Sequence, residues 1–215
     1  MIAVLTADLI DSTHYSEPLM SRVMTVLKEE FIDIEKTQPS SDFNIYRGDS
    51  FQGVLKDPAE ALVVMLQLKT AILRISTTKK GKLREADLRI AIGIGSLDYR
   101  GNTIEESNGQ AFQFSGRSLD KMKYESRKTR LKTPNEHING EFDASLFLFD
   151  EITDRWSTAS AEVIYFLLKG LKEKEIATAL GISQSAVNQR KKAAGWEAVN
   201  ALLVRYHHII SKTFT

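Results

Sequence analysis

Two aspartates stand where short apolar stretches of the chain end. Asp8 follows the β-rich run at 2–7, and Asp49 lies in the turn RGDS of the segment NIYRGDSFQGVL, in which Gly48 suits the backbone angles of a hairpin. If the first strand lies beside this hairpin, the two carboxylates approach each other, and a cation between them would relieve their repulsion. Oxygen ligands of this kind suit Mg²⁺, or Mn²⁺ in its place. The alternative is that Asp8 caps the following turn and Asp49 is merely solvated.

The elements that would position this pair follow the order β-α-β-β-α-β-α-β. We expect a strand at 2–7, a helix at 17–35, a hairpin at 44–55, a helix opened by Asp57-Pro58, a strand at 87–99, a helix at 111–126, a strand at 130–134 and a short amphipathic segment at 142–152. Gly93 and Gly95 stand in the strand at 87–99, where a side chain would crowd a neighbour. This order predicts an α+β fold, a ferredoxin-like (palm-type) antiparallel sheet with helices on one face.

The charge of the chain is unevenly divided. The 215 residues are 42% hydrophobic and carry 29 Lys and Arg against 28 Asp and Glu, enough chain for a medium domain, predicted at 1–152, and a small one at 153–215. From Ser157 onward there are eight basic and four acidic residues, which leaves 21 against 24 in the first 156. A basic C-terminal part behind a mildly acidic body favours contact with nucleic acid at one end.

The composition also indicates where the protein works. It has no cysteine, which excludes disulfides and thiolate metal sites and suits a reducing compartment. The N-terminus has no basic region before its apolar run, so we expect no signal peptide. The longest apolar runs, such as ALVVML, are too short to span a bilayer. We therefore expect a cytoplasmic protein with no membrane partner.

The C-terminal segment has the pattern of a small helix-turn-helix domain. We expect helices at 159–169, 173–180 and 183–194, ended or capped by Gly170, Gly181 and Ser183. Ala177 and Val187 stand at the spacing that lets two such helices pack closely. This stretch resembles the region-four-like helix-turn-helix of sigma factors and response regulators. A fourth helix, at 196–210, would cover the trihelical core or pair with a second copy.

The third of these helices is predicted to meet DNA. Its outward face carries amides, a hydroxyl and a cation that can contact base edges and phosphates: Gln184, Ser185, Asn188, Gln189 and Lys192. Arg190, Lys191 and Lys192 would add salt-sensitive attraction to the phosphate backbone. The alternative is a helical interaction module whose basic residues are only solvated.

Several blocks of the N-terminal part resemble a known group of proteins. AVLTADLIDST, YRGDSFQGVL and LRIAIGIGSL resemble, in order, segments of class III nucleotidyl cyclases, and RGDSF is also similar to diguanylate cyclases. The block at 48–53 and the later GQAFQFSGRSLDKMK together are most similar to the SatD-type family of small bacterial proteins. The resemblance covers most of residues 1–130.

This resemblance implies roles for particular residues. Asp8 and Asp49 would hold the metal, Arg117 would steady the transition state, and Gln113 stands where the cyclases offer an Asn to the ribose. Glu106 stands where the acid that specifies the purine would be. The lysine that specifies the base falls on Ile45, which cannot hydrogen-bond a base. Because cyclases of this type build each site from two chains, the resemblance also implies a homodimer.

Two functions follow from these observations. The first is a DNA-binding regulator whose degenerate cyclase-like domain dimerises and senses a nucleotide. The second is an active Mg²⁺-dependent nucleotidyl cyclase or nucleotidyl transferase with a helix-turn-helix tail. Ile45 and Gln113 favour the first, whereas Asp8, Asp49 and Arg117 support the second. A Rossmann or P-loop phosphate site is not predicted, because neither glycine motif is present in register.

Overall fold

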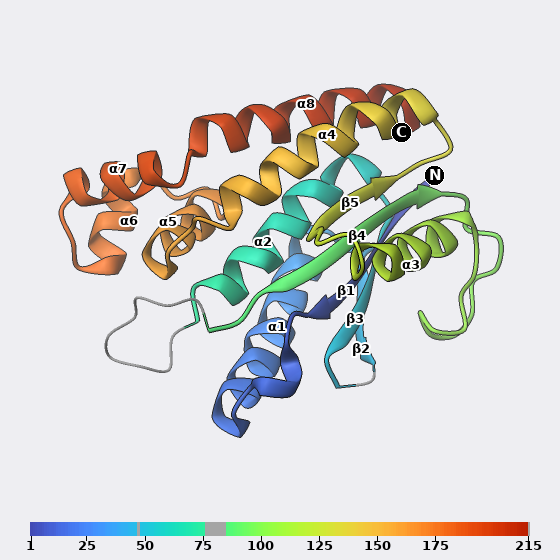
Figure 1. The fold of residues 1–215 in the computed structure, drawn as a ribbon, viewed down its shortest axis with the longest axis horizontal. Helices are drawn as coiled ribbons and strands as arrows, with labels where there is room; N and C mark the ends of the chain where they lie inside the picture. The colour runs from blue at the N-terminus through green and yellow to red at the C-terminus, as the bar shows by residue number, and fades with distance from the viewer. Residues whose placement is uncertain (47, 76–84, 215) are drawn as a thin grey trace.

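A five-stranded sheet forms the centre of the structure, a computed structural model that describes residues 1–46, 48–75 and 85–214 (Figure 1). Its strands are β1 (Ile2–Leu9), β2 (Asp42–Tyr46), β3 (Ser50–Leu55), β4 (Leu88–Gly95) and β5 (Thr129–Lys132), in the spatial order β2-β3-β1-β4-β5. The first four strands pair antiparallel, in the ferredoxin-like order expected from the sequence. The prediction of a purely antiparallel sheet is wrong, because β5 pairs parallel to β4 after a helical crossover.

Helices cover both faces of this sheet rather than one. On one face, alternate residues of β1, such as Leu5, join a hydrophobic core with α1 (Glu17–Thr37) and α2 (Ala61–Leu73). On the other face Val4 packs with α3 (Gln110–Met122), the crossover helix between β4 and β5. The predicted one-sided arrangement fails here, since a parallel β4-α3-β5 unit needs a helix across the face that α1 and α2 leave open.

Two glycines allow α3 to lie directly on β4. A Cβ atom added to Gly93 would lie 2.2 Å from the carbonyl oxygen of Ala111, and one added to Gly95 would lie 2.8 Å from the amide nitrogen of the same residue. The crowding predicted at these glycines is therefore confirmed. It fixes the height of α3, and hence of its side chains, above the sheet.

Local capping explains where several helices begin. The side chain of Asp57 accepts a hydrogen bond from the amide of Ala59 and opens a 3-10 turn, Pro58–Glu60, that leads into α2. The side chain of Asn135 accepts from the amides at 137 and 138, so α4 runs over Glu136–Thr153 and begins earlier than the amphipathic segment predicted at 142–152.

The helices predicted near the C-terminus are present. They are α5 (Thr158–Leu168), α6 (Glu173–Leu180), α7 (Gln184–Ala193) and α8 (Trp196–Phe214). Gly181 ends α6 in the left-handed conformation, at φ 63°, and the Ser183 hydroxyl caps α7 by accepting from the amide of Ala186. A small core shared by α5, α6 and α7 consists of Val163, Ile176, Ala177 and Val187.

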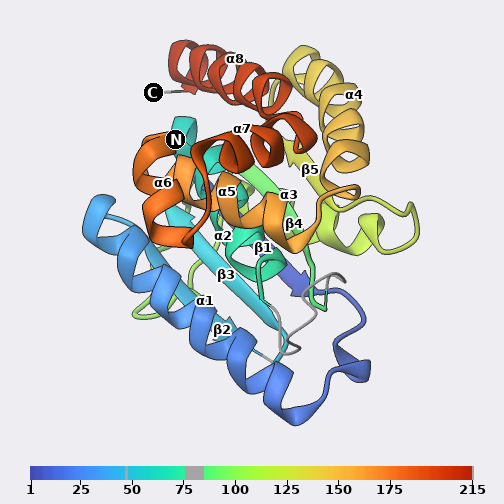
Figure 2. The same cartoon turned by 90° about the vertical axis from the view of Figure 1, so that its left-hand side faces the viewer.

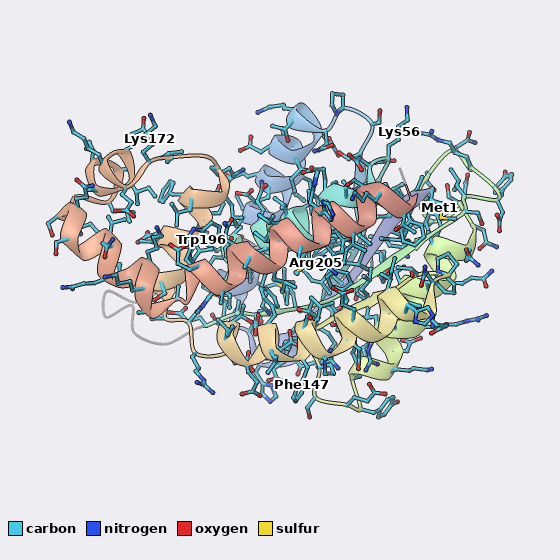
Figure 3. All side chains as sticks on the ribbon, turned by 90° about the horizontal axis from the view of Figure 1, so that it is seen from above. Met1, Lys56, Phe147, Lys172, Trp196 and Arg205 are labelled. Atoms are coloured by element: carbon cyan, nitrogen blue, oxygen red, sulfur yellow. The ribbon has the colours of Figure 1, made fainter. Side chains whose placement is uncertain are left out.

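The last helix packs mainly on the body of the protein, rather than on the trihelical core; pairing with a second copy stays a prediction. Its buried side chains Val199, Leu203, Tyr206 and Ile210 belong to the same core as α1 and α2. The Tyr206 hydroxyl donates to the carbonyl of Pro58, 3.1 Å away. Figures 2 and 3 show α8 running beside α4, where Arg205 and Glu141 form an ion pair. Among the described residues, no helix is both long enough and apolar enough to cross a membrane.

Candidate functional site

The carboxylate of Asp8 lies between two cations. Asp8 stands opposite Arg89 of β4 in the strand register, on the face of the sheet that α3 covers. Nη1 of Arg89 lies 3.4 Å from one carboxylate oxygen of Asp8 and 3.3 Å from the other, and Nζ of Lys123 lies 3.3 Å from the latter. Asp8 is 8% exposed, so these partners neutralise a nearly buried charge.

The backbone of Asp49 lies close to that of Asp8 across the paired strands β1 and β3, but the Asp49 side chain has other partners. Asp8 pairs with Ser50 across β1 and β3, and the amide of Leu9 donates to the Asp49 carbonyl at 2.9 Å. The Asp49 carboxylate accepts from the hydroxyl of Ser12 at 2.8 Å and from that of Ser50 at 3.1 Å. The fold therefore brings the two aspartates to one end of the sheet, as predicted, and gives their carboxylates separate contacts.

This donor set does not fit a resident divalent cation. Two positive side chains already hold the oxygens of Asp8, and a third positive charge beside them would be repelled. Among residues 1–46, 48–75 and 85–214, no group of three or more His, Cys, Asp or Glu side chains could hold a metal ion. A metal shared by Asp8 and Asp49 would require Arg89 and Lys123 to move away first.

The residues proposed for the nucleotide do not converge on Asp8 within the chain. Gln113 and Arg117 are both exposed and lie one turn apart on the outer side of α3. Glu106 is also exposed, and its carboxylate accepts from the amide of Asn102 at 3.0 Å, which closes a turn of its own loop. These positions are compatible with a site completed by a second chain, which stays a prediction.

A hollow of about 460 Å³ lies at the opposite end of β1 from Asp8. Ile2, Val54 and Phe112 give it an apolar part, and the cationic side chains of Lys56 and Arg100 line it as well. An apolar surface with a few charged groups is the usual lining of a small-molecule site. Glu106 is absent from its lining, although its neighbours in the 100–107 loop contribute to it.

Sequence reasoning missed a buried cluster of charges beneath the start of β4. Lys69 is fully buried in α2, and its Nζ lies 2.8 Å from a carboxylate oxygen of Asp87 and 3.0 Å from the carbonyl of Leu88. Lys128 forms a second ion pair with Asp87 at 3.1 Å. Nearby, burial raises the pKa of Asp150, whose carboxylate accepts from the amides of residues 128 and 129. A lysine inside the largely apolar run ALVVMLQLKTAIL was the available signal.

The outer face of α7 is polar and accessible. Gln184, Ser185, Gln189 and Lys192 are exposed and Asn188 is half-buried, whereas Val187 packs inward against α5 and α6. Four-residue spacing places Gln184 with Asn188, and Ser185 with Gln189, along one side of the helix. The packing of Val187 against α5 and α6 therefore holds α7 with its polar side facing outward.

The three consecutive cations of α7 have different surroundings. Arg190 forms an ion pair with Glu162, and Lys191 pairs with both Glu173 and Glu197, so its pKa is raised mainly by the hydrogen bond to Glu197. Lys192 is exposed, and no carboxylate in the described part of the chain forms an ion pair with it. Lys192 is therefore the cation of this run best placed to meet a phosphate.

Comparisons with known proteins give partial similarities to nucleotide cyclase domains. The guanylyl cyclase Cya2 is 17% identical over 56% of this chain and 69% of its own, with a TM-score of 0.40. The active GGEEF domain of a diguanylate cyclase from Vibrio cholerae is 14% identical over 62% of this chain and 83% of its own, with a TM-score of 0.43. A bacterial light-regulated adenylyl cyclase is 10% identical over 60% and 74%, with a TM-score of 0.42. No protein-family model and no curated protein matches the chain.

Proposed function

We propose that this protein is a DNA-binding regulator that reads DNA with α7 and uses its sheet domain for dimerisation and nucleotide sensing, without turnover. The observation that carries the proposal is the exposed polar face of α7, held by Val187 against α5 and α6. Amide and hydroxyl side chains on such a face match the donors and acceptors at base edges in the major groove. The surplus of basic residues after position 157 supports the same proposal.

The test of DNA binding is a mobility shift with the DNA upstream of the protein's own coding sequence. Gln184→Ala/Asn188→Ala is expected to weaken binding by about 1–3 kcal/mol for each bidentate base pairing that the variant can no longer make. Gln113→Ala is the matched control, because it removes an exposed helical amide from α3 instead of α7. Equal binding by the double variant and the wild type would contradict base reading by α7.

The sensing part of the proposal takes the hollow beside Lys56 and Arg100 as the nucleotide site. Its apolar part would pack against a base, and its cations would attract phosphates. Binding of a fluorescent nucleotide is expected to weaken in Lys56→Gln/Arg100→Gln and to persist in Asp8→Asn. Loss of nucleotide binding in Asp8→Asn alone would show instead that the nucleotide binds at the other end of β1.

A second candidate function, Mg²⁺-dependent nucleotidyl transfer, is favoured by the adjacency of the two aspartates. Asp8 and Asp49 meet at one end of the sheet through the pairing of β1 with β3. Incubation with each nucleoside triphosphate and Mg²⁺ or Mn²⁺, with detection of released pyrophosphate, tests it. We expect no release of pyrophosphate. Pyrophosphate release by the wild type that Asp49→Ala abolishes would replace the non-catalytic proposal.

A further inference from the structure

We infer that Arg89 is a built-in counter-ion that takes the place of a divalent cation at Asp8. This inference deepens the proposed function, since it gives the reason why the sheet domain would lack metal-dependent turnover. The strand register requires the contact, because Asp8 and Arg89 are direct partners on the same face of neighbouring antiparallel strands. A guanidinium is not deprotonated in proteins, so it is a permanent cation.

The position of Arg89 is fixed from two sides. Its Nη1 contacts both oxygens of Asp8, and its Nε donates to the carbonyl of Arg127, 3.2 Å away. Arg127 is itself held, since it is 6% exposed and donates to Asp143 through two nitrogens. The Arg89 side chain is only 17% exposed, so water competes little with its contact to Asp8.

Lys123 is a weaker partner of the same carboxylate. It follows the last residue of α3, and its side chain is 45% exposed, so it can leave the contact without disturbing the core. Removing Lys123 alone would leave Asp8 neutralised by Arg89. Removing Arg89 would instead leave a nearly buried carboxylate with only the more exposed Lys123 as its partner, beside the hairpin that carries Asp49. Such a carboxylate gains from any hard cation that reaches it.

The experiment is a Mn²⁺ titration of the full chain without nucleotide, followed by the electron paramagnetic resonance signal of free Mn²⁺. We expect the free Mn²⁺ signal with wild type or Lys123→Gln to equal that of buffer without protein up to about 1 mM Mn²⁺, the concentration range of weak oxygen sites. Arg89→Gln is expected to bind one ion roughly tenfold more tightly than wild type, and to show a rise in melting temperature with Mn²⁺. Asp8→Asn/Arg89→Gln should lose both effects.

Two results would overturn the inference. One is Mn²⁺ binding by the wild type that Asp8→Asn abolishes, and the other is an Arg89→Gln variant that binds no more tightly than wild type. If Arg89→Gln does not fold, Mn²⁺ binding by the wild type that Asp8→Asn abolishes would still overturn the inference. Failure here would leave DNA binding by α7 untouched, because the mobility shift is measured without Mn²⁺ and does not involve Asp8.

Discussion

The hydroxyl of Tyr165 on α5 donates a hydrogen bond to the buried carboxylate of Glu30 on α1. The same carboxylate also accepts from Gln67 at 2.9 Å and forms an ion pair with Lys169 at 3.0 Å, while the guanidinium of Arg74 lies 3.7 Å from the centre of the Tyr165 ring. These contacts join the first helix of the trihelical segment to α1 and α2. We infer that α5, and through it α7, has a fixed orientation relative to the sheet.

Tyr165→Phe tests that attachment. The change removes the donor to Glu30 and leaves the ring in place, so we expect a loss of about 1–3 kcal/mol in the free energy of unfolding, as for hydrogen bonds to charged groups. Tyr124→Phe is the matched control, because Tyr124 is 92% exposed. Urea denaturation of the two variants provides the comparison, and equal stability would contradict the proposed attachment.

The same tyrosine makes stability depend on alkaline pH. Burial raises the pKa of Tyr165 well above its usual value near 10, and the hydrogen bond to Glu30 adds to this effect. Folding therefore favours the protonated phenol, and the stabilisation is complete below pH 10 and declines as pH rises above it. As pH rises above about 10, the wild type should therefore lose stability more steeply than Tyr165→Phe. Parallel curves of stability against pH would contradict the raised pKa of Tyr165. Burial also raises the pKa of Tyr206, but this residue is present in both proteins, so its effect cancels in the comparison.

The close approach of α3 to β4 predicts opposite effects at two glycines. Gly93→Ala would push a methyl group into the backbone of α3 and is expected to destabilise the fold by about 1–3 kcal/mol or more. Gly116→Ala lies within α3 with nothing within 4 Å of its added Cβ, and should stabilise by about 0.5–1 kcal/mol through helix propensity. Thermal unfolding measures both changes. A neutral Gly93→Ala variant would show that α3 can shift.

Most elements of the fold could be predicted because their apolar periodicity is local. The helix around Phe31 and the strand around Ile92 are visible in the sequence, and the turns at Gly48 and Gly181 have the positive φ that glycine allows. The face on which α3 lies could not be read this way, because it depends on how the chain crosses over the sheet from β4 to the parallel strand β5. The position of α8 was missed for a similar reason, since its apolar stripe fits any apolar surface.

The candidate site was harder to predict than the fold. The sequence placed Asp8 and Asp49 at one end of the sheet correctly, because the order of strands fixes which ends meet. It did not show Arg89 as the partner of Asp8, because that contact needs the register of β1 against β4. The signal that could have found it is a single arginine in the otherwise apolar strand LRIAIGIG. Register, rather than residue type, decides the charge of this site.

Lys69 should be essential for stability. Its side chain is fully buried against Asp87, so Lys69→Met would leave that carboxylate with less compensation in the core. We expect a loss of about 3–5 kcal/mol, whereas Lys36→Met removes an exposed pair with Asp33 and should cost less than about 0.5 kcal/mol. Urea denaturation distinguishes the two. A small effect at Lys69 would show that Lys128 alone compensates Asp87.

Two neighbouring lysines on α7 should differ in their effect on DNA binding. Lys191 is held by Glu173 and Glu197, whereas Lys192 is exposed and has no ion pair among the described residues. If α7 lies in the major groove, Lys192→Gln should reduce by about 1 the slope of log affinity against log salt concentration, since the variant neutralises one phosphate fewer and releases one counter-ion fewer. Lys191→Gln should leave the slope unchanged, because its charge is already neutralised within the protein. Equal slopes in wild type and both variants would mean that this end of α7 does not face the phosphate backbone.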